Sequence, residues 1–210
     1  MIDPSELDLG RSVSREPMSI APVTLTGEQV QLVPLAREHL AALCRVGLDE
    51  ELWRLSPAPV RSAEDMQLYI EEALREQAEG KALPFAATLR ATGQAVGSTR
   101  FGNIDRNHRR LEIGWTWIAK SWQRTVVNTE AKYLMLAHAF ETLACLRVEF
   151  KTDYLNDRSR RAILRLGAQE EGVWRNHMIT ASGRIRHSVY FSMIDTEWPA
   201  IKTGLQRKLA

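Results

Sequence analysis

Apolar and polar residues alternate along several short stretches of the chain, and a two-residue period is typical of a β-strand with one buried face. Val30 and Leu32 alternate with two glutamines before a proline ends the pattern. The clearest run places Ile113, Trp115 and Trp117 on one face of a strand. The strands predicted in this way cover residues 29–33, 85–89, 95–101, 112–117, 148–152 and 189–193.

Apolar residues that recur every three or four positions predict helices elsewhere. A short helix is expected over residues 40–46. A longer one begins at a capping sequence that opens with Ser62 and ends near Gly80. A third helix covers residues 131–139, and a fourth opens on Asn156 and stops at Gly167. Residues 53–60 contain two prolines and are expected to form a loop.

The order of these elements predicts a mixed sheet. Residues 111–153 read as strand, helix and strand, which favours a right-handed crossover between parallel neighbours. Residues 91–94 form a good turn for an antiparallel hairpin. Residues 1–22 are rich in Ser, Pro and charge and show no periodicity, so we expect a flexible N-terminal arm followed by one domain over residues 23–210.

A polar loop between the strand at 112–117 and the helix that follows it predicts an anion site. The loop reads Gln123-Arg124-Thr125-Val126-Val127-Asn128. Its backbone N–H groups and the positive end of the helix converge on one place, and Arg124 adds a cation. From spacing alone, an ordinary polar connection is the simpler interpretation.

Composition narrows the classes of function. The 210 residues include 44% hydrophobic ones, enough for the core of one α/β domain, and the formal net charge is +2 without a long basic run. We therefore expect no nucleic-acid partner. No apolar run reaches the ~20 residues of a membrane span, and no signal peptide is recognisable, so we expect a cytoplasmic protein with no membrane partner. Cys44 and Cys145 lie far apart in apolar helical patterns and read as free thiols, with no zinc site.

Seven short motifs follow one another in a specific order. They are Glu112-Ile113-Gly114-Trp115, Trp122-Gln123, Asn128-Thr129-Glu130-Ala131-Lys132, His138-Ala139-Phe140-Glu141, Arg147-Val148-Glu149, Asn156-Asp157-Arg158-Ser159 and Arg165-Leu166-Gly167-Ala168. This series resembles the GNAT acetyltransferase superfamily, and most closely its RimJ/RimL-like N-acetyltransferase branch. The resemblance extends from about Leu25 onward. It implies an α+β (mixed α/β) fold: a mixed, mostly antiparallel central sheet flanked by helices, with one parallel strand pair at the acyl-CoA site.

The phosphate loop departs from the superfamily pattern, which usually reads Gln/Arg-x-x-Gly-x-Gly/Ala. Val126 and Asn128 stand at the two glycine positions. Glycine adopts positive φ at little cost, whereas a β-branched valine does not. Asn128 tolerates left-handed geometry, and it is also a good N-cap for the helix that follows.

The resemblance implies acyl transfer to an amine, with acetyl-CoA or another acyl-CoA as co-substrate and no metal. A backbone N–H of the strand at 114–117 would polarise the thioester carbonyl. The residues implied to bind the co-substrate are Trp115, Thr116 and Trp117 of the strand, Gln123, Arg124, Thr125, Val126, Val127 and Asn128 of the loop, and Asn156, Arg158 and Ser159 of the next helix.

The acceptor amine must lose a proton before it attacks, because an alkylammonium has a pKa of ~10.4. The resemblance implies Glu112 as the base, since Glu112 opens the strand beside the reaction centre. An equally acceptable interpretation is a half-buried structural carboxylate paired with Arg100 or Arg110. His108 and His177 are weaker alternatives for the base.

The departing thiolate needs a proton in return. Many members of the superfamily use a tyrosine in the helix after the last central strand, and Ser159 takes that place here, as in several RimL-like members. Asn156 would cap this helix and could also hydrogen-bond the pantetheine arm. A pure N-cap, with Ser159 at the third helical position, is equally economical.

The acceptor pocket is the least determined part of the site. The resemblance places it between the first two helices, their connection and the last strands. The residues suggested as substrate-binding are Trp53, Tyr69, Trp174, Arg175 and His177. Aromatic residues at such spacing are more often packing groups of the core.

Three classes of function are left open. The first is acetyl transfer to a protein N-terminus or a small-molecule amine. The second keeps the fold but transfers another acyl group, such as succinyl. The third is a CoA-binding homologue with little catalysis. A homodimer is compatible with all three.

Overall fold

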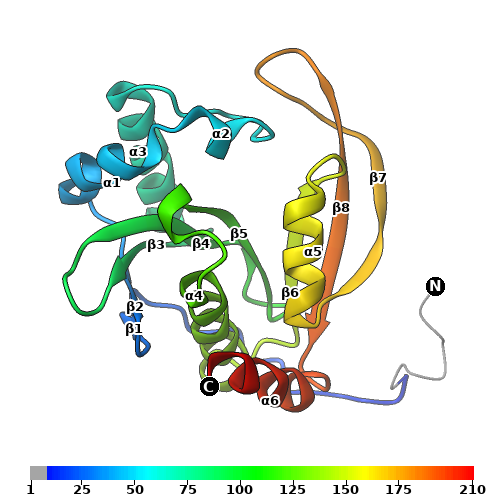
Figure 1. Cartoon of the computed structure of the whole chain (residues 1–210). Coiled ribbons are helices and arrows are strands. Elements are labelled where there is room, and N and C mark those ends of the chain that lie inside the picture. The colour runs from blue at the N-terminus through cyan, green and yellow to red at the C-terminus, as the bar shows by residue number, and fades with distance from the viewer. Residues whose placement is uncertain (1–8) are drawn as a thin grey trace.

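Eight strands form one sheet in the order β1-β2-β3-β4-β5-β6-β8-β7 in the computed structural model, which describes residues 9–210 (Figure 1). Every neighbouring pair is antiparallel except β5 and β6, as the predicted fold class requires. The strands are β1 (Leu25–Thr26), β2 (Val30–Pro34), β3 (Leu83–Leu89), β4 (Ala95–Asp105), β5 (Arg110–Ile118), β6 (Arg147–Asp153), β7 (Gln169–Ile179) and β8 (Ile185–Ile194).

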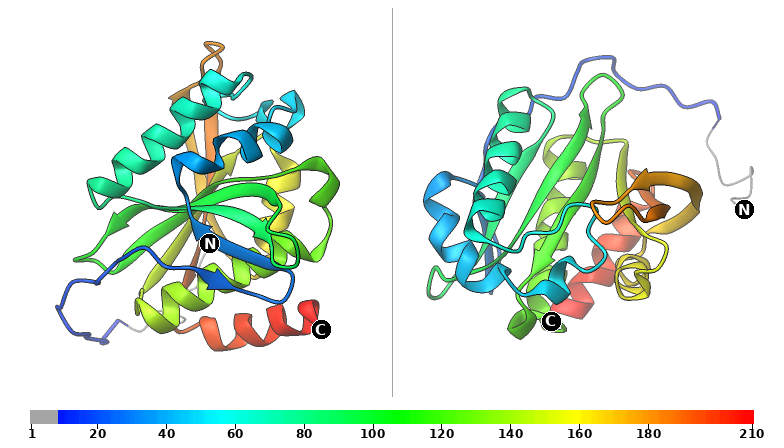
Figure 2. Two further views of the ribbon diagram at one scale, coloured as in Figure 1. Left: turned by 90° about the vertical axis from the view of Figure 1, so that its left-hand side faces the viewer. Right: turned by 90° about the horizontal axis from the view of Figure 1, so that it is seen from above.

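The helices cover both faces of the sheet, as Figure 2 shows. They are α1 (Leu40–Gly47), α2 (Glu50–Trp53), α3 (Ala63–Ala78), α4 (Val126–Ala137), α5 (Asp157–Leu166) and α6 (Trp198–Leu209), and a π turn (His138–Thr142) prolongs α4. The side chains between the sheet and α4, α5 and α6 form the larger hydrophobic core. A second core lies between β3–β4 and the α1–α3 layer. The sheet therefore has an α4 face and an α3 face.

A β-bulge interrupts β5 at Trp115. Ser98 pairs with Trp117 and Arg100 pairs with Gly114, so two residues of β5 oppose the single residue Thr99 of β4. The extra residue reverses the inside–outside alternation that the sequence predicts. Trp117 consequently packs in the second core, while Trp115 is 38% exposed with a φ of 50°.

Local sequence signals position several elements as predicted. Ser62 caps α3, because its side chain accepts a hydrogen bond from the N–H of Asp65. Gly167 ends α5 with a φ of 105°, a left-handed conformation that glycine adopts at little cost. The β3–β4 hairpin and the short helix α1 also lie where they are predicted.

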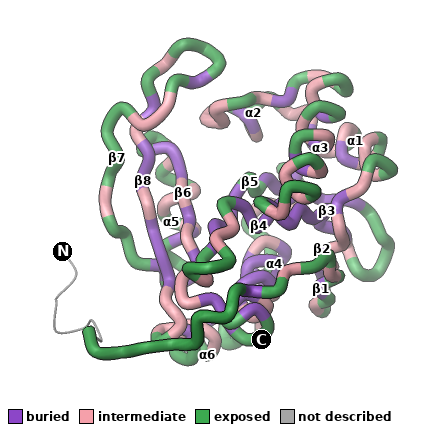
Figure 3. The backbone as a smooth tube through the Cα atoms, turned by 180° about the vertical axis from the view of Figure 1, so that it is seen from behind, coloured by how far each residue is buried: buried purple, intermediate pink, exposed green. Residues whose placement is uncertain are grey.

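The pattern does not predict β1, α2, β7 or α6. Most residues of β7 are exposed, as the green tube in Figure 3 shows, so the strand lacks the alternation that identifies a half-buried one. The short helix α2 depends on a cap from Asp49, whose side chain accepts from the N–H of Glu51.

The described part of the predicted N-terminal arm contacts the domain, and Ile20 packs against the larger core. Met18 is buried, and its N–H donates to the carbonyl of Arg106 at 3.1 Å. Arg11 forms an ion pair with Asp195. Residues 1–8 of the predicted arm lie outside the described residues. Within residues 9–210, no helix is long and apolar enough to cross a membrane.

Candidate functional site

Strands β5 and β6 separate after a short paired stretch, which opens the sheet on one side of β5. Their parallel pairing runs from Arg110–Arg147 to Glu112–Glu149. Beyond it, within residues 9–210, β5 pairs with β4 alone, and the two strands diverge in Figure 1. The edge of β5 that carries the bulge therefore presents backbone groups toward the gap.

The predicted phosphate loop leads into α4 at one end of this gap. Thr125 caps α4, because its Oγ1 accepts from the N–H of Val127 at 3.3 Å. The predicted N-cap at Asn128 is therefore wrong: the helix begins at Val126, and Asn128 already lies within its first turn. The left-handed residue of the loop is Arg124, with a φ of 63°. Val126 is thus helical and carries none of the strain expected from its position in the glycine pattern.

The start of α5 reaches the same loop. Asn156 is its N-cap and accepts from the N–H of Ser159 at 3.0 Å, so the capping interpretation of these two residues is confirmed. Arg158 donates to Gln123 Oε1 at 2.7 Å, while Gln123 donates to the carbonyl of Ile118 at 2.9 Å. The N-termini of α4 and α5, each with unpaired N–H groups and a positive dipole end, are joined through Gln123.

A buried lysine that the sequence interpretation missed lies on the α4 face beside the bulge. Lys132 Nζ donates to Thr116 Oγ1 at 2.5 Å and to Thr99 Oγ1 at 3.1 Å. Burial lowers the pKa of Lys132 to about 7. Lys132 and Met135 both lie on the buried face of α4, and their three-residue spacing is the signal that marks this lysine as an inward-facing one.

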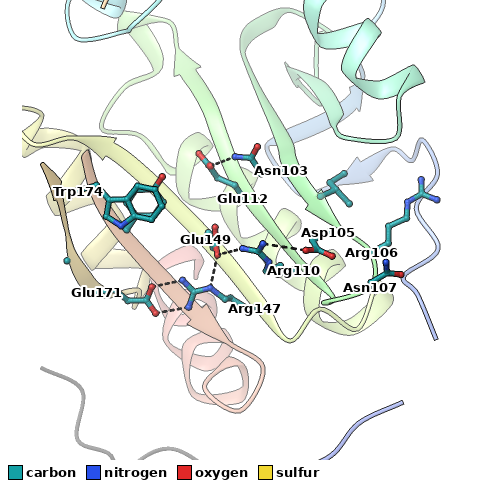
Figure 4. Close-up of a pocket in the computed structure, with 13 residues that line it drawn as sticks. Asn103, Asp105, Arg106, Asn107, Arg110, Glu112, Arg147, Glu149, Glu171 and Trp174 are labelled. Carbon is teal, nitrogen blue, oxygen red and sulfur yellow. Dashed lines mark hydrogen bonds and ion pairs between the residues drawn. The ribbon is translucent and has the colours of Figure 1, made fainter. Parts of the chain in front are cut away.

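A polar cavity of about 680 Å³ opens on the α3 face of the sheet, with walls from β4 to β8 (Figure 4). Carboxylates and guanidinium groups alternate across it. Arg147 holds Glu149 at 2.8 Å and Glu171 at 2.5 Å, and Arg110 contacts Glu149 at 3.3 Å. These ion pairs restrain the charges, and Glu112 lies apart from them beside Asn103 (Figure 4).

Glu112 is 3% exposed and paired differently from either sequence-based alternative. Its Oε2 accepts from Asn103 Nδ2 at 2.7 Å and lies 3.3 Å from Lys151 Nζ. The expected pairing with Arg100 or Arg110 is wrong, because Arg100 pairs with Glu76 and Arg110 with Asp105 and Glu149. The bend at Asn103, which has a φ of 47°, aims that amide at the carboxylate.

A cluster of Arg100, Tyr69 and Trp115 lies next to Glu112 on the same face. Tyr69 and Trp115 are among the predicted site residues, whereas the sequence interpretation missed Arg100. The Cζ atom of Arg100 is 4.9 Å from the ring centroid of Trp115 and 5.1 Å from that of Tyr69. Tyr69 in turn donates from its hydroxyl to Ser98 Oγ at 3.1 Å and to the carbonyl of Trp115 at 3.3 Å. The helix α3 thereby fixes one side of the bulge.

The other predicted acceptor residues fall into two groups. Trp53 is buried in the second core and donates from Nε1 to the carbonyl of Gly47, so it packs as a core residue. Trp174, Arg175 and His177 line a hollow along β7. Trp174 stacks on Tyr190 at 4.3 Å, and the pKa of His177 is lowered by burial and by the nearby charges of Lys151 and Arg186. His108 lies in the exposed turn before β5.

Both cysteines are free thiols, and Cys145 is buried, which raises its pKa to about 12. Within the described residues, no group of three or more His, Cys, Asp or Glu side chains is arranged to hold a metal ion.

The family model for the acetyltransferase (GNAT) domain matches residues 29–169. The chain belongs to the GNAT acetyltransferase family. Membership of this family makes the protein an acyltransferase, and its relatives support the predicted RimJ/RimL-like branch.

Two curated relatives are N-acetyltransferases by name. The protein p20 of Bacillus licheniformis is 27% identical over 179 residues, which cover 83% of this chain and 98% of p20. YdaF of Bacillus subtilis (strain 168), whose name describes a ribosomal N-acetyltransferase, is 33% identical over 116 residues, which cover 55% of this chain and 62% of YdaF.

Solved structures share the fold. A GCN5-related N-acetyltransferase from Brucella melitensis matches with a TM-score of 0.84 and 29% identity, over 93% of this chain and 89% of that one. RimJ from Mycobacterium smegmatis, solved in complex with CoA-disulfide, has a TM-score of 0.76 and 24% identity, over 89% of this chain and 95% of RimJ.

Proposed function

We propose that this protein transfers an acetyl group from acetyl-CoA to a primary amine in a ternary complex. The observation that carries the proposal is the gap beside β5, which the N-termini of α4 and α5 border and where the bulge at Trp115 exposes backbone groups. Acetyl-CoA would supply the acyl group as a thioester. Its acidic phosphates fit the backbone N–H groups around Val126 and the cation of Arg124.

Different residues around the gap are proposed to contact different parts of acetyl-CoA. We assign the diphosphate to residues 123–128, where the positive helix end favours an anion. Trp115, Thr116 and Trp117 provide backbone groups along the pantetheine arm and the carbonyl, and an oxyanion donor of this type is worth ~2.7–4 kcal/mol. Asn156, Arg158 and Ser159 border the arm from α5. Ser159 is the residue proposed to return a proton to the thiolate.

Glu112 is proposed to accept the proton of the acceptor ammonium. It lines the polar cavity on the α3 face, across β5 from Lys132, so an amine in that cavity would approach β5 from the side opposite α4. The acceptor is a small-molecule amine or a protein N-terminus. The name of YdaF favours the second, and a cytoplasmic location would suit both.

Ligand-induced thermal stabilisation tests the donor assignment. A ligand present at a hundredfold excess over its Kd stabilises the native state by ~2.7 kcal/mol. For a domain of this size, the melting temperature should rise by about 5–10 °C with acetyl-CoA and nearly as much with free CoA. ATP, NAD and S-adenosylmethionine should have little effect. An unchanged melting temperature with every CoA thioester would reject the proposal.

Product analysis tests the transferred group. Mass spectrometry of a panel of amines and N-terminal peptides should show a gain of one acetyl group with acetyl-CoA. A clearly larger thermal shift and faster product formation with succinyl-CoA would instead identify succinyl as the acyl group. Binding of CoA without turnover of any amine would identify a CoA-binding homologue with little catalysis.

A further inference from the structure

Arg100 is fully buried, and part of its hydrogen-bonding capacity is unused. Its side chain is 1% exposed, and Nη1 donates to Glu76 Oε2 at 2.9 Å. Nε and Nη2 have no hydrogen-bond partner among residues 9–210. Folded proteins pair most of their buried donors, so a buried guanidinium with two unpaired nitrogens indicates a partner that arrives from outside the chain.

The two unpaired nitrogens have the geometry of a fork. By the covalent structure of arginine, Nε and Nη2 lie on the same edge of the planar guanidinium, and their N–H bonds point in nearly parallel directions. A carboxylate, with two oxygens in one plane, matches this edge with two charge-assisted hydrogen bonds. Glu76 occupies Nη1 at the other end of the group and leaves this edge unused.

The Trp115 side chain packs against the Arg100 guanidinium. Its ring lies over the guanidinium, yet the residue is 38% exposed and its φ of 50° is a conformation that bulky residues rarely adopt. Gly102 provides the room for the ring, because a Cβ there would come within 2.3 Å of it. The ring thus packs against Arg100 and Gly102, while more than a third of the residue is exposed.

The fork lies beside the proposed base. Arg100 pairs across the strands with Gly114, and Glu112 leans over that glycine, since a Cβ at Gly114 would lie 2.8 Å from Glu112 Oε1. Glu112 lines the polar cavity. Arg100 is not one of the lining residues, but its strand partner Gly114 is the next residue after Glu112 on this face of β5.

We propose that Arg100 binds a carboxylate of the acceptor through Nε and Nη2 when the Trp115 ring moves aside, while the amine of the same acceptor faces Glu112. This inference rests on the proposed acyl transfer. It narrows the acceptor to amines that carry a carboxylate a few bonds away. Two sources share this chemistry, free amino acids and peptides that begin with an acidic residue.

Matched acceptors test the proposal. The first arm compares phenylalanine with phenylalaninamide and phenethylamine. The second compares C-terminally amidated peptides that begin with Asp or with Asn. Thiol release from acetyl-CoA gives kcat/KM for each. In at least one arm the carboxylate-bearing acceptor should be preferred by about 10- to 100-fold, the worth of a charge-assisted pair, and the preferred arm identifies the source.

Three variants connect that preference to the fork. R100Q should reduce the preference to within about 2-fold, mainly through KM. R100K keeps the charge without the fork and should behave similarly. E76Q removes the existing partner and should retain the preference. Circular dichroism and the thermal shift with acetyl-CoA show whether each variant is folded with an intact donor site.

Calorimetry in the presence of free CoA measures the same preference without turnover. The carboxylate-bearing acceptor should bind to the wild type more tightly than its amide, and R100Q should abolish the difference. The role of Arg100 would be overturned if each carboxylate-bearing acceptor and its uncharged counterpart had equal kcat/KM in both arms, or if the preference survived R100Q. Either result would leave acyl transfer intact. If no acceptor is acetylated, absence of a carboxylate preference in calorimetry still overturns it, and the acetyl-CoA thermal shift judges the proposed function separately.

Discussion

The two faces of β5 present different chemical groups: main-chain groups on the α4 face and charged side chains on the α3 face. On the α4 face, the gap is bordered by main-chain groups: the bulge at Trp115, the first turn of α4 behind its Thr125 cap, and the start of α5. On the α3 face, the cavity is bordered by paired side-chain charges, with Glu112, Glu149 and Arg147 contributed by two strands. A backbone-built site binds a chemical group common to many ligands, whereas a site built from side chains can discriminate between ligands.

The comparison also explains why Lys132 and Glu112 differ in their surroundings. Lys132 is enclosed on the α4 face with two threonine hydroxyls as its hydrogen-bond partners. Glu112 has an opposite charge within 3.3 Å and opens onto a cavity. Burial without an opposite charge disfavours a charged group, while an ion pair favours it.

The largest expected effect concerns Glu112 on the α3 face. E112Q keeps the shape of the side chain and removes its basicity, so turnover at pH 7 should fall by about 100-fold, the typical worth of a general base. The loss should shrink at alkaline pH, where more of the acceptor amine is already unprotonated. Steady-state kinetics from pH 6 to 10 measure this, and the Kd for acetyl-CoA should stay within about twofold.

Glu149 provides the matched control, because it is the partner of Glu112 across β5 and β6 and lines the same cavity. E149Q removes a carboxylate that Arg147 and Arg110 already hold, and its turnover should remain within a few-fold of the wild type. If E112Q has the pH profile of the wild type, Glu112 is a structural residue and the amine is deprotonated elsewhere.

The second effect is on stability and concerns Lys132 on the α4 face. Its pKa is about 7 in the folded protein and ~10.4 in an unfolded chain, so the unfolded state binds more protons between these values. The free energy of unfolding should therefore increase with pH across this window, and the burial penalty should be fully present below pH 7. The contribution of Lys132 is a rise of ~2 kcal/mol from pH 7 to pH 9.

Denaturant unfolding at several pH values measures this rise. K132M replaces the amine with an apolar chain of similar length, and the two threonine hydroxyls it contacted remain paired with each other at 2.7 Å. The variant should be more stable than the wild type at pH 7 and should lack that part of the pH dependence. K120M at an exposed position should preserve it. If the stability of the wild type and that of K132M change with pH in the same way, Lys132 is charged in the folded protein.

Sequence patterns predict those parts of the fold that depend on residues close together in the sequence. Ser62 and Gly167 act within one turn of their helices, and the parallel β5–β6 pair follows from the strand–helix–strand order. The bulge at Trp115 is not predictable in this way, because it exists only in the register between β4 and β5.

The same reason limits the prediction of the candidate site. The phosphate loop and the start of α5 are each one continuous run of residues, so each is readable from the sequence, and Arg158 of α5 donates to Gln123 of the loop. Glu76 and Arg100 are 24 positions apart and come from a helix and a strand, so no local pattern connects them. The pairing of Glu112 with Lys151 likewise depends on the register between the parallel strands β5 and β6, which no local pattern gives, so the sequence suggested Arg100 and Arg110 instead.

The smallest effect tests the backbone character of the α4 face at Val126. This residue occupies the first position of α4, where its N–H has no acceptor within the helix and proline is tolerated. Thr125 before it is extended, with a φ of −103° and a ψ of 179°, as a residue that precedes proline must be. V126P therefore removes one N–H from the proposed phosphate cradle at little cost to the fold. The Kd for acetyl-CoA should rise by about 5-fold, corresponding to the ~1 kcal/mol of one hydrogen bond.

V126A shortens the same exposed side chain but keeps the N–H, and its Kd should match that of the wild type in calorimetry. Equal affinity of V126P and V126A, with equal melting temperatures, would mean that side chains such as Arg124 bind the phosphates and that the α4 face discriminates by charge as the α3 face does.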